Sequence, residues 1–293
     1  MKLAKRHSEK YGPGESQKEV ESGIREILEN KKSFYTGSEM MAKALSCIDL
    51  TSLNTSDNKQ VADKMCNSVN TFGERFKDLQ NVAAICVYPA LLDDVKKNLM
   101  APGVKIACVG AGFPSSQTFL SIKLAECELI ASRGADEIDI VFSLGKFLSG
   151  QYQYVADEIS LIKEAIKDIH LKVILETGKL ETHENIRAAS LLALESGADF
   201  IKTSTGKEKP AATPEAVYIM ANAIKDYYRA TGIKAGIKPA GGISTPEGAA
   251  TYACLVSEIL GSEWMDKRLF RIGASRLANN LLSEIRGEEI EFF

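Results

Sequence analysis

From residue 45 onward, short strand-like runs of apolar residues alternate with longer segments that have helical spacing. The runs are LSCIDLT (45–51), VAAICVY (82–88), KIACVGA (105–111), EIDIVFS (137–143), KVILETG (172–178), FIKTSTG (200–206), KAGIKPA (234–240) and LFRIGAS (269–275). Segments such as 115–135 and 213–232 separate them and have the periodicity of helices. Strands that alternate with helices predict a parallel sheet. Runs that are apolar almost throughout predict strands covered on both faces.

Eight strand–helix units within about 230 residues predict an α/β fold, a (β/α)8 TIM barrel. An open doubly wound sheet is the alternative, which is less well supported because no G-x-G-x-x-G follows the first strand. Residues 1–40 are polar, and their helical spacing places Val20, Ile24, Ile27 and Leu28 on one face. We therefore predict an N-terminal helical extension, a loose arm and an accessory helix over 1–40, followed by a single barrel domain over 41–293.

The composition is that of an ordinary globular chain, with 45% hydrophobic and 26% charged residues. A net charge of −3 suggests neither a nucleic-acid nor a membrane partner, and no apolar run approaches the ~20 residues that span a bilayer. The six cysteines form no C-x-x-C pair and the three histidines are scattered, so neither a metal site nor a Ser-His-Asp triad is indicated. We expect a cytoplasmic protein that needs no cofactor.

Two of the strand-like runs place a lysine near their C-terminal ends, Lys202 in FIKTSTG and Lys238 in AGIKPAGG. The C-terminal ends of barrel strands carry the active site. Burial and a neighbouring cation both lower the pKa of a lysine, and the neutral amine can then form a Schiff base with a carbonyl. Because strands six and seven should be adjacent, about 4.8 Å apart, Lys238 is expected to be that neighbour of Lys202. Two structural lysines paired with carboxylates are the alternative.

Asp139 lies inside the run EIDIVFS, so its side chain is expected to be buried and paired with a lysine. Such a pair could relay protons, or it could be a structural salt bridge. Asp136 and Glu137 precede the apolar residues and are expected to cap or solvate the start of the strand. The other polar residues at strand ends are Asp49, Thr51 and Cys86. Cys86 could equally be a small buried hydrophobic residue.

Glycine-containing loops follow the last three strands: STGK (204–207), PAGGIST (239–245) and IGAS (272–275). Glycine allows backbone N–H groups to approach an anion closely. The second loop opens a helix, with Ser244 or Thr245 as N-cap and Pro246 in the first turn, and a helix N-terminus favours phosphate. Lys207 could add a positive charge. The residues alone therefore predict a Schiff-base aldolase with a phosphorylated carbonyl substrate.

The motifs FIKTSTGK, IKPAGG, DEIDIVF, AAICVYP and DLTSLN together resemble the 2-deoxyribose-5-phosphate aldolase family of class I aldolases, over roughly residues 45–285. The resemblance implies reversible cleavage of 2-deoxy-D-ribose 5-phosphate to D-glyceraldehyde 3-phosphate and acetaldehyde, within deoxyribonucleotide catabolism. It implies that Lys202 forms the Schiff base, that Lys238 depresses its pKa, and that Asp139 shuttles protons. It places Asp49, Cys86 and Thr205 at the sugar, and Gly206, Lys207, Gly241, Gly242, Gly273 and Ser275 at the phosphate. Thr51, at the end of the first strand, is a further candidate for substrate binding. Members are often dimers, so a homodimer is possible.

The chain departs from this family at two loop positions and at its end. Many members carry a basic residue where this chain has Ser244, and serine or threonine where it has Arg276. We hypothesise that Arg276 replaces the missing cation beside the phosphate. The chain ends EEIEFF, whereas bacterial members have a tail tyrosine that assists proton transfer, so reduced turnover is expected. The alternatives are an aldolase-like binding or scaffold protein with weak or lost lyase activity, and a Schiff-base aldolase for another phosphorylated substrate.

Overall fold

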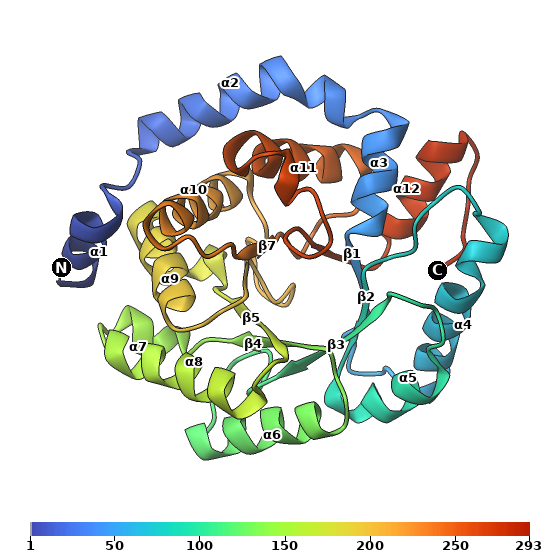
Figure 1. Cartoon of the computed structure of the whole chain (residues 1–293), viewed down its shortest axis with the longest axis horizontal. Coiled ribbons are helices and arrows are strands. Elements are labelled where there is room, and N and C mark those ends of the chain that lie inside the picture. Colours follow the sequence, from blue (N-terminus) through green and yellow to red (C-terminus); the bar gives the residue numbers. More distant parts are fainter. Residues whose placement is uncertain (1) are drawn as a thin grey trace.

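Each of the eight strand-like runs overlaps one strand of a single parallel sheet in the computed structural model, which describes residues 2–293 (Figure 1). The strands are β1 (Ile48–Thr51), β2 (Ala84–Val87), β3 (Lys105–Gly110), β4 (Glu137–Val141), β5 (His170–Ile174), β6 (Phe200–Lys202), β7 (Gly236–Lys238) and β8 (Ile272–Ala274). The sheet runs in the order β7-β6-β5-β4-β3-β2-β1-β8. Backbone bridges from Ile237 to Phe270 and from Ala240 to Gly273 join its two edges. The predicted TIM barrel is therefore confirmed.

Helices surround the sheet and connect successive strands, as Figure 1 shows in a view into the barrel. They are α4 (Lys59–Arg75), α5 (Leu92–Asn98), α6 (Leu120–Ser132), α7 (Leu144–Leu148), α8 (Tyr152–Ile166), α9 (His183–Glu195), α10 (Pro214–Thr231), α11 (Pro246–Leu260) and α12 (Leu277–Arg286), with short 3-10 helices η1 (Pro89–Leu91), η2 (Thr177–Lys179) and η3 (Ser262–Trp264). Within residues 2–293, none of the helices combines the length and apolarity needed to cross a membrane.

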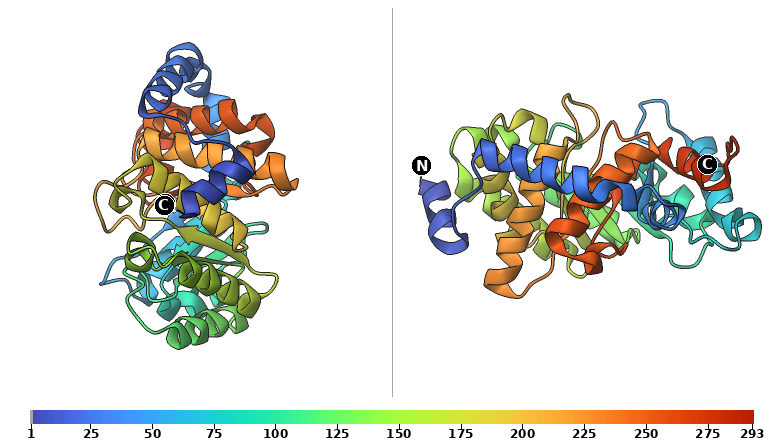
Figure 2. Two further views of the ribbon diagram at one scale, coloured as in Figure 1. Left: turned by 90° about the vertical axis from the view of Figure 1, so that its left-hand side faces the viewer. Right: turned by 90° about the horizontal axis from the view of Figure 1, so that it is seen from above.

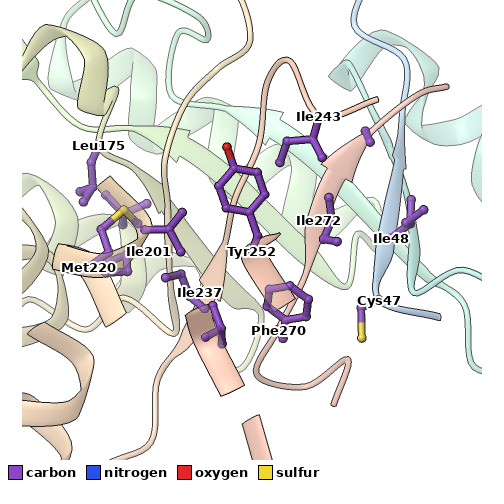
Figure 3. Close-up of a cluster of buried hydrophobic side chains, with 14 of the residues drawn as sticks. Cys47, Ile48, Leu175, Ile201, Met220, Ile237, Ile243, Tyr252, Phe270 and Ile272 are labelled. Carbon is purple, nitrogen blue, oxygen red and sulfur yellow. The ribbon is translucent and has the colours of Figure 1, made fainter. Parts of the chain in front are cut away.

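Alternation along the strands sends apolar side chains outward and charged ones inward. Ile201 of β6 and Ile237 of β7 belong to the core between strands and helices, where Met220 of α10 and Tyr252 of α11 also lie (Figure 3). Their chain neighbours Lys202 and Lys238 fall on the opposite, inner face, because successive side chains of a strand point to opposite sides.

The inner faces of β2 and β3 carry small side chains. Ala84, Cys86, Ala107 and Val109 form a buried cluster separate from the outer core. Small residues on these two strands leave room inside the barrel for long charged side chains from the strands opposite. The sequence thereby makes the barrel interior an ionic site, although the sheet is apolar outside.

The N-terminal extension consists of three helices, α1 (Lys2–Tyr11), α2 (Gln17–Tyr35) and α3 (Ser38–Ser46). The prediction of a loose arm before the accessory helix is therefore wrong. The arm forms α1, which buries Leu3, His7 and Tyr11 and packs beside α9. Glu195, the last residue of α9, accepts hydrogen bonds from α1, including one from Tyr11 at 2.9 Å. Polar composition suggested disorder, but one face of the segment meets a complementary site on the barrel.

The accessory helix is confirmed as α2, which runs along the outside of α10 and α11 (Figure 2). Ser16 caps it by accepting a hydrogen bond from the Glu19 N–H, and the Glu19 carboxylate accepts one from the Ser16 N–H, as in a capping box. Helix α3 crosses the predicted boundary between residues 40 and 41. The division into an extension and a barrel domain stays a prediction.

Candidate active site

Seven charged side chains meet inside the barrel, and none is more than 3% exposed. They are Asp49 on β1, Glu137 and Asp139 on β4, Lys172 on β5, Lys202 on β6, Lys238 on β7 and Arg271 just before β8. Strand register brings them together, because Lys202 pairs with Lys238 and Asp139 with Lys172 across neighbouring strands. The predicted adjacency of the two lysines is confirmed. So many buried charges are tolerable only because each one has a partner of opposite sign.

Asp139 stands at the centre of this ion cluster. One carboxylate oxygen, Oδ2, accepts hydrogen bonds from Lys202 Nζ at 2.8 Å and Lys238 Nζ at 2.7 Å. The other, Oδ1, accepts from Lys172 Nζ at 3.0 Å. Burial acts to raise the pKa of Asp139, but the three ammonium groups outweigh it and hold that pKa well below its usual range. The expectation of a buried, lysine-paired aspartate is confirmed.

The pKa values of the two predicted lysines are shifted in opposite directions. Burial lowers the pKa of Lys202, Asp139 opposes this, and the nearby Lys238 ammonium lowers it further. Burial acts on Lys238 too, but Asp139 and Asp49 outweigh it and raise the pKa of Lys238. Asp49 Oδ2 lies only 2.5 Å from Lys238 Nζ. Of the two lysines, Lys202 is therefore the one that releases its proton more readily, next to an ammonium at Lys238.

Three members of the ion cluster, Glu137, Lys172 and Arg271, were not identified as site residues from the sequence. Glu137 was expected to cap or solvate the start of its strand, and this is wrong, because Glu137 is buried and accepts hydrogen bonds from Lys172 and Arg271. Its spacing of two residues from Asp139 was the available signal, since residues i and i+2 of a strand share a face. Arg271 also donates to Asp49 at 2.6 Å. No sequence signal marked Arg271, which lies just outside β8.

A cavity of about 270 Å³ opens above Lys202 at the C-terminal ends of the strands. Its walls come from the loops after β1, β6, β7 and β8. It is lined by predicted residues from the ends of these strands and from the loops that follow them: Thr51, Thr205, Gly206, Lys207, Gly241, Gly242, Ser244, Gly273, Ser275 and Arg276. Leu53 and Asn54, which the sequence did not single out, line it as well.

The other two predicted substrate residues lie deeper in the barrel. Asp49 is fully buried in the ion cluster, and Cys86 is fully buried in the apolar cluster with Ala107 and Val109. Burial raises the pKa of the Cys86 thiol, which keeps it neutral. Contacts of Asp49 and Cys86 with a substrate stay predictions.

The rim of the cavity is suited to an anion. Gly206, Gly241 and Gly242 have φ of +80°, +88° and +79°, the left-handed conformation that glycine adopts without strain. Thr245 caps α11 through its hydroxyl, which settles the predicted choice between Ser244 and Thr245, and α12 begins directly after Arg276. The loops that lead into α11 and α12 and two cations, Lys207 and Arg276, therefore line the same cavity. Across residues 2–293, no cluster of three or more His, Cys, Asp or Glu side chains could hold a metal ion.

Glu176, which the sequence did not identify, joins the loop after β5 to the loop after β6. Its backbone is left-handed, with φ of +51°, and its side chain is 4% exposed. The carboxylate accepts hydrogen bonds from the hydroxyl of Thr205 at 2.5 Å and from the backbone N–H of Thr205 at 3.2 Å. Burial raises the pKa of Glu176, although the bonds from Thr205 oppose the shift. Glu176 therefore fixes a residue of the cavity wall.

Comparisons with known proteins agree with this geometry. A family model described as DeoC/LacD family aldolase matches residues 43–252. The chain is 41% identical to the deoxyribose-phosphate aldolase of Homo sapiens, with 84% of this chain and 80% of that protein covered, and 40% identical to that of Bos taurus over the same shares. The solved structure of the tetrameric deoxyribose phosphate aldolase of Aeropyrum pernix superposes with a TM-score of 0.64. It is 23% identical and covers 92% of this chain and 98% of that one, which is a likeness in fold.

Proposed function

Because the chain belongs to the DeoC/LacD family of aldolases, we propose that it is a class I aldolase that reversibly cleaves 2-deoxy-D-ribose 5-phosphate to D-glyceraldehyde 3-phosphate and acetaldehyde. One observation carries the proposal. Lys202, the lysine with the lowered pKa, is also the member of the ion cluster that lines the cavity, and the cavity rim is cationic. The names of the relatives that are 40–41% identical support the choice of substrate.

The phosphate binds at the rim, where Lys207, Arg276 and the glycine loops supply positive charge and N–H donors. Thr205, held by Glu176, faces the sugar chain below the phosphate. The aldehyde end of the open-chain sugar then points down to Lys202. Binding at both ends orients the carbonyl for attack.

The neutral amine of Lys202 attacks the C1 carbonyl to give a carbinolamine, which loses water to become an iminium. A base removes the proton of the C3 hydroxyl, the C2–C3 bond breaks, and its electron pair moves into the iminium to form an enamine. Glyceraldehyde 3-phosphate leaves. Protonation of the enamine at C2 and hydrolysis of the resulting iminium release acetaldehyde and restore the amine. Asp139 and the Lys238 ammonium, both at the amine, move these protons through a water molecule.

A binding or scaffold protein with little lyase activity is the second candidate, motivated by Ser244, Arg276 and the N-terminal extension. The complete set of contacts among Lys202, Asp139 and Lys238 favours the enzyme. A cytoplasmic location and a homodimer are part of the proposal, with the sequence composition and the resemblance as their only support.

Borohydride trapping tests the proposal. The protein is incubated with deoxyribose 5-phosphate, reduced, digested and analysed by mass spectrometry, with turnover measured in parallel. We expect an adduct on Lys202, and none on that peptide in Lys202→Met. Lys207→Met, which keeps the nucleophile, should still form the adduct. Absence of any adduct would refute the aldolase assignment, and an adduct without turnover would favour the binding protein.

A further inference from the structure

The buried ion cluster contains one cation more than it contains carboxylates. Its four cations are Lys172, Lys202, Lys238 and Arg271, and its three carboxylates are Asp49, Glu137 and Asp139. With every group ionised, the cluster would hold an uncompensated positive charge inside the barrel. A buried net charge is costly, and loss of one proton removes it.

Three of the cations are poor candidates for that loss. Arginine does not release its proton in proteins, and Arg271 contacts both Asp49 at 2.6 Å and Glu137 at 2.7 Å. Lys172 lies within 4 Å of three carboxylates, those of Glu137, Asp139 and Asp49. Lys238, described above, bridges two. Each of these cations is compensated by more than one carboxylate.

Lys202 is the exception. Within residues 2–293 its ammonium contacts a single carboxylate, Asp139 at 2.8 Å, and it shares that carboxylate with Lys172 and Lys238. It also lines the open cavity, so a released proton can reach solvent. Neutrality of the cluster is therefore reached most easily when Lys202 is the free amine.

We propose that Arg271 supplies the excess positive charge that drives the proton from Lys202, and that Glu137 opposes it. Arg271 acts at a distance, through Asp49 and Glu137, and is thus a positioning and charge-setting residue rather than a catalytic one. The inference deepens the proposed function, on which the role of Lys202 as a nucleophile rests. Glu137, the first residue of β4, and Arg271, before β8, lie on the side of the cluster away from the cavity.

The groups around Lys202 come from all sides of the barrel. They are Asp49 from β1, Cys86 from β2, Glu137 and Asp139 from β4, Lys172 from β5, Glu176 after β5, Lys238 from β7 and Arg271 before β8. Burial raises the pKa of Cys86, so this thiol adds no charge. Glu176 bonds to Thr205 and belongs to the loop layer above the cluster. Glu176 is present in every variant compared below, so the differences among them report on Arg271 and Glu137.

The charge count predicts that removing Arg271 and removing the charge of Glu137 shift the pKa of Lys202 in opposite directions. Arg271→Met leaves equal numbers of cations and carboxylates, so Lys202 should keep its proton to higher pH. Glu137→Gln raises the excess, so Lys202 should lose its proton at lower pH. Removing a unit charge from a buried cluster of effective dielectric constant ~20 shifts the pKa of another member by on the order of one unit. At a pH below the titration, Arg271→Met should therefore lower the fraction of free amine about tenfold.

Competitive labelling with trace acetic anhydride measures the proton state of Lys202 without requiring turnover. The rate of acetylation is followed against pH by mass spectrometry of the Lys202 peptide, and the pH profile of kcat/KM is recorded in parallel. We expect an upward shift for Arg271→Met, a downward shift for Glu137→Gln, and a return towards the wild-type profile for the double variant. Arg271→Lys keeps the charge and should keep the profile.

A structural role for Arg271 predicts something different, namely a loss of rate at every pH with the profile unmoved, and that result would overturn the inference. A double variant that titrates like Arg271→Met would overturn it too. If Arg271→Met fails to fold, as judged by circular dichroism, the shift of Glu137→Gln and the unmoved profile of Arg271→Lys decide the question. Absence of a borohydride adduct would refute the aldolase and not the charge balance, which the labelling reports independently.

Discussion

Replacing Arg276 with alanine should selectively impair the use of a phosphorylated substrate. Arg276 is exposed at the cavity rim, directly before α12. The other rim cation, Lys207, already donates a hydrogen bond to the backbone carbonyl of Leu53. Arg276 therefore offers a guanidinium able to grip a phosphate through two parallel N–H donors.

The expected loss of kcat/KM in Arg276→Ala follows from the exposure of the Arg276 side chain. A hydrogen bond to a charged group contributes about 1.5–3 kcal/mol, and solvent around an exposed side chain favours the lower end. A loss of about 1.5 kcal/mol corresponds to a roughly tenfold fall in kcat/KM. The effect should appear with deoxyribose 5-phosphate and be absent with unphosphorylated deoxyribose, since only the former reaches the rim with an anion.

The assay compares kcat/KM for the two sugars in wild type and Arg276→Ala, with aldehyde production coupled to a dehydrogenase. Ser244 supplies a matched rescue, because Asn280 of α12 donates to the Ser244 carbonyl at 2.7 Å and so holds the Ser244 loop beside the helix that follows Arg276. Ser244→Arg in the Arg276→Ala background should restore the preference for the phosphorylated sugar. An unchanged ratio between the two sugars in Arg276→Ala would refute the reasoning.

Three further changes test other parts of the molecule. Glu176→Ala removes the acceptor of the Thr205 hydroxyl and N–H, so kcat/KM should fall about tenfold and the free energy of unfolding, measured by urea denaturation, should fall by about 1–3 kcal/mol. Lys123→Met leaves the buried carboxylate of Glu158, which Lys123 contacts at 2.7 Å, without its cation and should cost about 3–5 kcal/mol in the free energy of unfolding. Phe292→Ala removes edge-on aromatic contacts with Phe72 of α4 and with Phe76, which follows that helix, and should cost about 1–3 kcal/mol by urea denaturation, with kcat unaffected. A loss of kcat in Phe292→Ala at full stability would contradict a purely structural role.

Much of the fold could be predicted because its signals are local. Each strand of the barrel buries both faces, so each appears in the sequence as an apolar run, and the intervening helices have their own period. The same logic identified Lys202, Lys238 and Asp139, since a charge inside an apolar run is unusual wherever it occurs. The N-terminal arm shows the opposite case. Helix α1 is polar in composition, and its order depends on contacts with Glu195, far away in the chain.

The sequence by itself therefore determined the barrel and the identity of its lysine pair. Only the tertiary structure decided which carboxylate of the ion cluster contacts which cation. Asp49, Glu137 and Arg271 come from distant parts of the chain, and their interaction depends on strand register and on which face each side chain occupies. Register and barrel closure are long-range properties that no local pattern encodes. Electrostatic energy depends on those distances and on burial, so the proton affinity of Lys202 is a property of the folded barrel and not of the motif that contains it.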